Sequence, residues 1–196
     1  SDSLERFLEA LPSNVIVVID EAYFEYVKEA DYPDGIELLS RFPNLIVVRT
    51  FSKAYGLAGL RVGYAIASDQ ITEVLNRVRH PFNVNSLALI AAEAALTDQS
   101  FVVDSVSENL KGLRQLESGF ADLDLEWIPS VANFICVRVG ANAMQIFDSM
   151  LRQGVIVRPV ANYGLTEHLR ISVGLDQENN RALQALKTAL LETVST

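Results

Sequence analysis

The sequence has very little of the residues that make covalent or metal cross-links. Cys136 is the only cysteine among 196 residues, so no disulfide can form within the chain. The only two histidines, His80 and His168, lie far apart and offer no metal-ligand spacing. We therefore predict no metal site. Because Cys136 sits in the apolar run "NFICVRV", we expect a buried and inert thiol.

Long apolar runs and a basic excess are also lacking. No apolar run of about 18 residues occurs, and the first residues, "SDSLERFLEALPSN", have neither the basic nor the apolar region of a signal peptide. The formal net charge is −9, whereas a protein that tracks nucleic-acid phosphates needs a basic excess. These absences predict a soluble, cytoplasmic chain that binds neither a membrane nor nucleic acid.

What the sequence does have is apolar material and an uneven charge. Hydrophobic residues make up 49% of the chain, which is ample for a packed core. Residues 1–40 carry ten acids and two bases, whereas residues 41–80 carry two acids and six bases. A small anionic ligand would suit this local cationic excess better than a polyanion would.

Three β-branched runs in the first half predict strands, namely Asn14–Asp20, Asn44–Thr50 and Arg61–Ser68. The first two are continuous apolar runs, as expected for parallel strands buried on both faces. Helical patterns follow, with Asp69 as a predicted N-cap, an alanine-rich helix after Asn85 and a long helix over residues 99–123.

After Trp127 the sequence pattern changes from mainly helical to a mixture of strands and helices, and it predicts a β-α-β-β-α order. The predicted elements are strand Asn133–Val139, a helix over 142–153 closed by Gly154, strands 155–160 and His168–Gly174, and a helix from about Asp176. We predict a small C-terminal α+β domain over 116–196 and part of a larger α/β domain over 1–115. Strands buried on both faces need more neighbours than residues 1–115 supply, so we expect the C-terminal portion of a longer polypeptide.

Ionisable side chains follow the first two predicted strands. Asp20 and Tyr23 follow the first, and Ser52 and Lys53 follow the second within "TFSKAYGLAGLRVGY", which also contains Arg61. Ligands of open parallel sheets bind beyond the carboxyl ends of the strands, so these groups should share a pocket. A carboxylate, a phenol, a hydroxyl, an amine and an arginine are the set that a pyridoxal phosphate enzyme needs. The small residues between Lys53 and Arg61 would let the backbone turn and approach the cofactor closely.

Simpler structural roles compete with these assignments. Asp20 alone could be the N-cap of a helix in the acidic stretch that follows it. Asn83 and Asn85 are interpreted first as turn and cap residues. Glu21, Glu25 and Glu29 are predicted to form a solvated face.

Four segments, "VVIDEAYFEY", "VVRTFSKAYGLAGLRVGYAIA", "HPFNVN" and "HLRISVG", together look like the histidinol-phosphate aminotransferase family. This family lies within the fold-type I pyridoxal phosphate transaminases. The resemblance covers essentially the whole chain and implies an α/β fold, made of part of a large domain with a mostly parallel sheet and a small C-terminal domain. Family members carry earlier segments of the cofactor pocket, so this chain would hold only part of it.

The resemblance implies a role for each residue of the constellation. Lys53 would form the Schiff base with pyridoxal 5'-phosphate and move protons during catalysis. Asp20 would face the pyridine nitrogen, and Tyr23 would hydrogen-bond the phenolic oxygen. Ser52 and Arg61 would bind the phosphate.

The substrate side is also implied by the resemblance. Arg170, and with it Arg158, would bind the anionic group of the substrate in a transamination between L-histidinol phosphate and 2-oxoglutarate. The resemblance further implies a homodimer. Two alternatives stay open: another aminotransferase, for example for aromatic amino acids, or a related phosphothreonine decarboxylase. A third is a silent fragment or an assembly module that binds a partner through an uncovered sheet edge.

Overall fold

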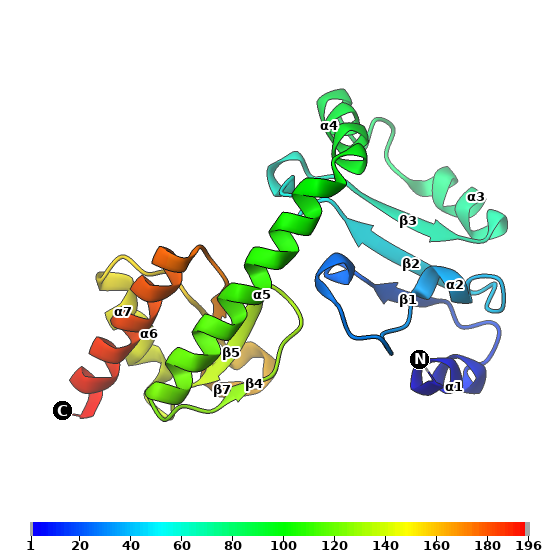
Figure 1. The fold of residues 1–196 in the computed structure, drawn as a ribbon. Coiled ribbons are helices and arrows are strands. Elements are labelled where there is room, and N and C mark those ends of the chain that lie inside the picture. Colours follow the sequence, from blue (N-terminus) through cyan, green and yellow to red (C-terminus); the bar gives the residue numbers. More distant parts are fainter. Residues whose placement is uncertain (1, 195–196) are drawn as a thin grey trace. The chain divides into compact units, whose positions relative to one another are not determined.

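The computed structural model describes residues 2–194 and divides the chain into two compact units, Ser1–Ser105 and Val106–Thr196 (Figure 1). The division falls inside the long helix α5 (Gln99–Asp122), earlier than the boundary that the sequence predicts at residue 115. The assignment of the two parts to a cofactor domain and a small domain stays a prediction.

The first unit contains a three-stranded sheet with helices on both faces. In chain order its elements are α1 (Asp2–Ala10), β1 (Val17–Asp20), the 3-10 helix η1 (Phe24–Tyr26), α2 (Gly35–Leu38), β2 (Leu45–Thr50), the 3-10 helix η2 (Ala58–Leu60), β3 (Gly63–Ala67), α3 (Asp69–Val78), α4 (Ser86–Thr97) and the start of α5. The strand order is β1-β2-β3, with β1 parallel to β2 and β3 antiparallel to it.

Burial within this sheet is uneven. Leu45 and Val47 of β2 are fully buried and pack with Leu8 of α1 and Leu38 of α2, while Ile46 between them is also buried. The prediction of burial on both faces is therefore confirmed for the first half of β2. It is wrong for β1 in the described part of the chain, since Val18 is 58% exposed.

Helix α4 covers the loop that joins β2 to β3. Ala88 and Ala92 of α4 are buried against Phe51 and Val62, which flank that loop. Asn85 caps α4 through its side chain, which accepts a hydrogen bond from the Ala88 amide at 2.8 Å, so its predicted role as a cap is confirmed. At α3 the prediction is wrong by one residue, because Ser68 is the N-cap and Asp69 already belongs to the helix.

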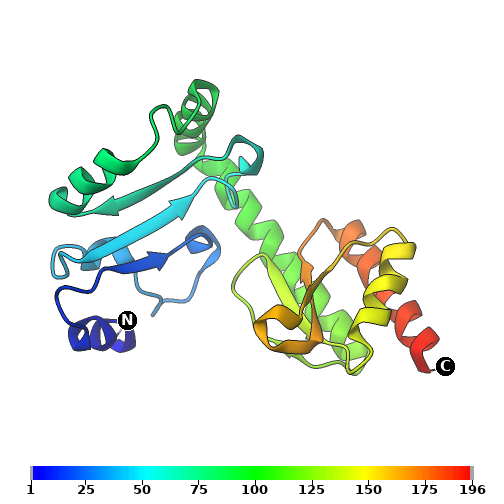
Figure 2. The same cartoon turned by 180° about the vertical axis from the view of Figure 1, so that it is seen from behind.

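The second unit contains a four-stranded sheet with helices gathered on one face (Figure 2). Its elements are the rest of α5, β4 (Trp127–Ile128), β5 (Phe134–Arg138), α6 (Ala143–Arg152), β6 (Arg158–Val160), the 3-10 helix η3 (Ala161–Tyr163), β7 (Leu165–Ser172) and α7 (Asp176–Val194). The strand order is β4-β5-β7-β6, and all pairs are antiparallel.

The core of this unit lies between the sheet and its three helices. Phe120 of α5, Ile146 of α6 and Leu186 of α7 pack with Ile135 and Leu169 of the sheet. The predicted β-α-β-β-α order is confirmed, and the short strand β4 is an addition to it. Gly154 has a φ of +79° just after the C-cap of α6, as the predicted helix stop requires.

Among the residues that the structure describes, no single helix is both long and apolar enough to cross a membrane, although α4 and α5 pass that test together as a bent pair.

Candidate active site

The parallel pairing of β1 with β2 brings the carboxyl ends of these strands to one edge of the sheet. Asp20 is the last residue of β1 and lies opposite Val48 of β2. The chain leaves β2 at Thr50 and reaches Ser52 and Lys53 directly afterwards. The groups that the sequence predicts to share a pocket therefore start from neighbouring strand ends.

Lys53 is the amine of this group, and it lies beside Tyr23. Its Nζ atom is 5.2 Å from the centroid of the Tyr23 ring, and its side chain is half-buried. Within residues 2–194, Lys53 forms no ion pair with a carboxylate. An ammonium group without a carboxylate partner is available to a ligand.

Asp20 is an exposed residue at the end of β1. One carboxylate oxygen accepts a hydrogen bond from the Ala22 amide at 3.0 Å, the local contact that an aspartate makes at the start of a turn. The helix that follows, η1, has Tyr23 and not Asp20 at its N-cap position. The alternative prediction that Asp20 is a helix N-cap is therefore wrong.

Ser52 and Arg61 lie side by side across the loop between β2 and β3. The Arg61 Nη1 atom donates to the carbonyl oxygen of Ala58 at 2.9 Å and lies 3.4 Å from the Ser52 hydroxyl. Arg61 has φ +54° and ψ +53°, a left-handed conformation that costs a non-glycine residue roughly 1–2 kcal/mol. Like Lys53, Arg61 has no carboxylate partner among the described residues.

Two glycines in this loop have positions that a larger residue would strain. Gly56 has a φ of +71°, and a Cβ on Gly63 would lie 2.8 Å from the backbone oxygen of Arg49. A Cβ on Gly59, in contrast, would meet no atom within 4 Å. The small residues thus allow the turn and leave open space at Gly59.

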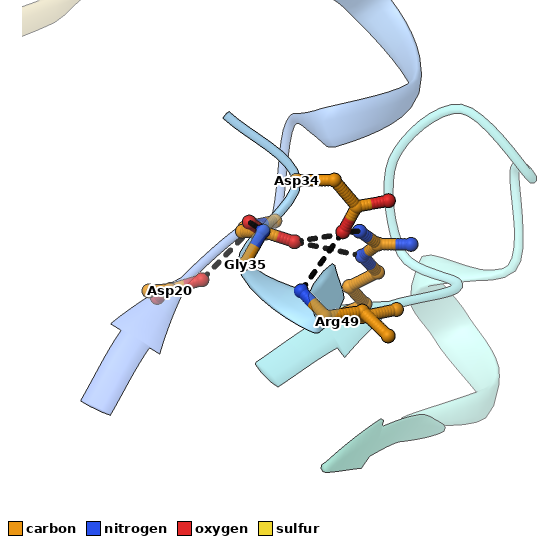
Figure 3. A network of polar contacts seen from close by, with 7 residues as sticks. Asp20, Asp34, Gly35 and Arg49 are labelled. Atoms are coloured by element: carbon orange, nitrogen blue, oxygen red, sulfur yellow. Dashed lines mark hydrogen bonds and ion pairs between the residues drawn. The ribbon is translucent and has the colours of Figure 1, made fainter. Parts of the chain in front are cut away.

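A buried charge network lies next to these groups, and it corrects one prediction. Glu21, which the sequence places on a solvated face, is only 2% exposed and pairs with Arg49. Arg49 also pairs with Asp34, and Figure 3 shows these two side chains pointing toward each other. Sequence reasoning also missed Arg49. The signal was present, because an arginine inside a buried strand needs an acidic partner.

Burial also changes the acidity of Glu25, a second member of the predicted solvated face. Desolvation raises the pKa of its carboxyl group, although its own backbone amide and the charge of Arg49 act in the opposite direction. Its Oε2 atom is buried and has no hydrogen-bond partner in the described structure. The ionised form of Glu25 is therefore disfavoured by its surroundings.

The two candidate substrate arginines lie opposite each other in the second unit. Arg158 of β6 and Arg170 of β7 are a cross-strand pair in an antiparallel ladder. Leu169 and Ile171 face the core, so Arg170 belongs to the sheet face that the helices leave open. Arg170 lies 4.8 Å from the Phe134 ring, and its buried Nε atom has no hydrogen-bond partner among the described residues.

Like charges directly opposite in a sheet are destabilising, and neither arginine forms an ion pair with a carboxylate in residues 2–194. The pair is therefore suited to an anionic ligand. Cys136 lies opposite Arg170 on β5 and is only half-buried, so the prediction of a buried thiol is only partly right. Burial nevertheless raises the pKa of this thiol, and the charge of Arg170 opposes the effect.

An α/β unit with an amine, a carboxylate, a phenol and an arginine at its strand ends is the organisation of a cofactor-dependent transferase. The profile of the family "Aminotransferase class I and II" matches residues 1–186, and the chain belongs to this family.

Two curated relatives are identical to this chain at more than half of the aligned residues. The chain is 55% identical over 190 residues to "Histidinol-phosphate aminotransferase 2" of Pseudomonas fluorescens strain Pf0-1, covering 97% of this chain and 51% of the relative. It is 53% identical over 192 residues to "Histidinol-phosphate aminotransferase 1" of Nitrosococcus oceani, covering 98% of this chain and 52% of that protein. The chain thus spans about half the length of the curated relatives it matches.

Solved structures share the fold. Histidinol-phosphate aminotransferase from Sinorhizobium meliloti, solved with pyridoxal-5'-phosphate, superposes with a TM-score of 0.91 at 32% identity over 98% of this chain and 53% of its own. L-threonine-O-3-phosphate decarboxylase from Porphyromonas gingivalis superposes with a TM-score of 0.81 at 26% identity over 97% of this chain and 59% of its own. The predicted fold-type I α/β class is confirmed by these matches.

Proposed function

We propose that this chain holds one part of the active site of a pyridoxal phosphate-dependent histidinol-phosphate aminotransferase. The observation that carries the proposal is the pair of cations Lys53 and Arg61, which lack carboxylate partners in the described residues and lie on the loop after β2. The names of the curated relatives and the cofactor in the Sinorhizobium meliloti structure support it.

The residues present fit the cofactor chemically. Arg61 and the Ser52 hydroxyl lie within 3.4 Å of each other and together offer donors to a phosphate. The open space beside Gly59 leaves room for such a group. Asp20, exposed at the end of β1, is an acceptor for a protonated ring nitrogen, and Tyr23 is a donor for a phenolic oxygen.

When bound, the cofactor supplies an electron sink for the substrate's α-carbon. Lys53 would hold the cofactor through its amine and would carry a proton to and from the substrate carbon. Asp20 keeps the ring nitrogen protonated through a charge-assisted hydrogen bond. Tyr23 orients Lys53, whose Nζ atom it faces at 5.2 Å.

For the substrates we propose L-histidinol phosphate as amino donor and 2-oxoglutarate as acceptor. Arg158 and Arg170 would bind their anionic groups, because the two guanidinium groups are cross-strand neighbours without carboxylate partners in residues 2–194. Both substrates carry a phosphate or a carboxylate that such a pair can hold. We also propose that the protein forms a homodimer and is located in the cytoplasm.

The test uses the complete protein that contains this chain. With pyridoxal phosphate it should develop a visible absorbance band, and Lys53→Ala should abolish the band. Arg41→Ala is the control, since Arg41 pairs with Glu5 and Glu9 in the same unit. Retention of the band in Lys53→Ala would overturn the role of Lys53, and absence of any band from the unsubstituted protein would overturn the proposed cofactor and favour an assembly module.

The structural similarity to the phosphothreonine decarboxylase supports a second candidate function. Steady-state rates with histidinol phosphate, aromatic amino acids and phosphothreonine separate the candidates. The first proposal requires that histidinol phosphate has the highest kcat/KM and that 2-oxoglutarate is consumed in equal amount. Release of carbon dioxide from phosphothreonine would instead favour the decarboxylase.

A further inference from the structure

Glu21 is a buried carboxylate directly beside the proposed cofactor ligand Asp20. Successive strand residues point to opposite faces, so the two acids have separate surroundings. The Glu21 Oε1 atom accepts from the Gly35 amide at 2.8 Å, and Oε2 accepts from Arg49 Nε at 2.9 Å. Glu21 thereby joins the end of β1, the start of α2 and the end of β2.

Arg49 is held from several sides. Its Nη2 atom lies 2.6 Å from the Asp34 carboxylate, and its guanidinium carbon lies 3.6 Å from the centroid of the Phe24 ring. Burial disfavours its charge, but the hydrogen bond and charge of Glu21, followed by the charge of Asp34, raise the pKa of Arg49 above its ordinary value. The side chain is 9% exposed and stays charged in this position.

The network reaches the proposed site through two consecutive aromatic residues. Phe24 lies on the guanidinium of Arg49, and Tyr23 lies 5.2 Å from the amine of Lys53. Arg49 and Lys53 belong to the same segment at the end of β2. The turn after β1 is thus docked on the end of β2 by the Phe24–Arg49 contact and the carboxylate of Glu21, and on the segment after β2 by the Tyr23–Lys53 contact.

We propose that Glu21, acting through Arg49, is a positioning residue that holds Tyr23 against Lys53. This inference rests on the proposed function, since it concerns the geometry of the same cofactor pocket. A buried ion pair contributes little net stability, whereas loss of one partner leaves the other charge without compensation. The ion pair matters here because the fixed guanidinium group of Arg49 orients the turn that carries Tyr23.

A defined consequence follows for the bound cofactor. A hydrogen bond from Tyr23 withdraws electron density from the phenolic oxygen and so weakens the bond between that oxygen and the proton on the lysine linkage. If the turn loosens, this hydrogen bond weakens and the linkage holds its proton to higher pH. The pH midpoint of the visible band therefore reports the position of Tyr23 as well as the integrity of the fold.

The experiment compares three variants of the complete protein. Glu21→Gln removes the charge that Arg49 faces. Asp34→Asn removes the second charge but keeps a good cap for α2, because the Asp34 side chain accepts from the Ile36 amide. Arg41→Gln is the control, since Arg41 also pairs with two carboxylates in this unit but is 52% exposed.

Three quantities are measured for each variant: the dissociation constant of pyridoxal phosphate, the pH midpoint of its visible band, and amide hydrogen exchange over residues 22–27. For Glu21→Gln we expect about tenfold weaker cofactor binding, which corresponds to about 1.4 kcal/mol, a midpoint raised by about 0.5 unit, and faster exchange. Asp34→Asn should change each quantity in the same direction by a smaller amount, about threefold in affinity.

Equal midpoints and affinities in Glu21→Gln and Arg41→Gln would overturn the proposal. If Glu21→Gln does not fold, Asp34→Asn decides in the same way: an unchanged midpoint overturns the proposal and a raised one supports it. Failure of the proposed function looks different, because the unsubstituted protein would then show no Lys53-dependent band. In that case unchanged exchange over residues 22–27 in Glu21→Gln would still refute the positioning role.

Discussion

Replacement of Arg61 by glycine should separate folding from cofactor binding. Arg61 has a left-handed backbone with φ +54°, so glycine relieves roughly 1–2 kcal/mol of strain. Two effects of the substitution lower the stability. The greater freedom of glycine in the unfolded chain costs about 0.5–1 kcal/mol, and the lost hydrogen bond to Ala58 costs about 0.5 kcal/mol. The free energy of unfolding without cofactor should stay within about 1 kcal/mol of the unsubstituted value.

Cofactor binding should respond very differently to the same change. A charge-assisted hydrogen bond to a phosphate contributes about 1.5–3 kcal/mol, so the affinity for pyridoxal phosphate should fall by about 10–100-fold. Urea unfolding of the cofactor-free complete protein measures the first quantity, and titration of the visible band measures the second.

Asp124→Gly is the matched control for Arg61→Gly. Asp124 also has a positive φ, of +56°, but lies in the second unit. This variant should gain about 0.5–1 kcal/mol of stability and keep its cofactor affinity. The reasoning is refuted if Arg61→Gly binds cofactor as tightly as Asp124→Gly, or if it loses more than about 2 kcal/mol of stability without cofactor.

Three further predictions test other parts of the structure. Arg170→Gln should raise the KM for the phosphorylated substrate by at least about tenfold, whereas Arg138→Gln, which loses only exposed ion pairs on the neighbouring strand, should not; equal KM values would contradict the anion role. The raised pKa of Glu25 means that the folded state binds its proton more tightly than the unfolded state does. Stability should therefore decline as the pH rises above 4.5, and Glu25→Gln should remove that decline in melting curves taken from pH 5 to 8; an unchanged slope would show that Glu25 ionises normally. Phe120→Ala should lower the free energy of unfolding by about 3–5 kcal/mol, because Phe120 is fully buried and lies 6.1 Å from the Trp127 ring; a loss below about 1 kcal/mol would mean that this core is loosely packed.

The parts of the fold that can be predicted from the sequence are those whose pattern is local. The apolar run of β2 and the helical period of α5 are located to within a few residues, since each depends on neighbours along the chain. The direction of β3 cannot be read in the same way, because its own residues are compatible with either pairing. The two-residue strand β4 is too short for any period to show.

The residues of the candidate site also differ in whether a local sequence pattern indicates their role. Lys53, Ser52 and Arg61 belong to one continuous stretch, and their spacing points to a cofactor. An arginine inside a buried strand indicates that Arg49 has an acidic partner, but no local spacing identifies that partner, because Arg49 is 28 residues from Glu21 and 15 from Asp34. Each acid resembles a surface residue until the fold brings the three segments together, so the buried role of Glu21 escapes sequence reasoning.

The neighbouring acids at the end of β1 make this strand unusually intolerant of a change in length. Asp20 is exposed at the strand end, while Glu21 is buried against Arg49 and Gly35. Insertion or deletion of one residue before Asp20 would exchange the sides to which the two carboxylates point. During evolutionary divergence, single-residue insertions and deletions should therefore be removed from this strand even where many of its side chains can be substituted.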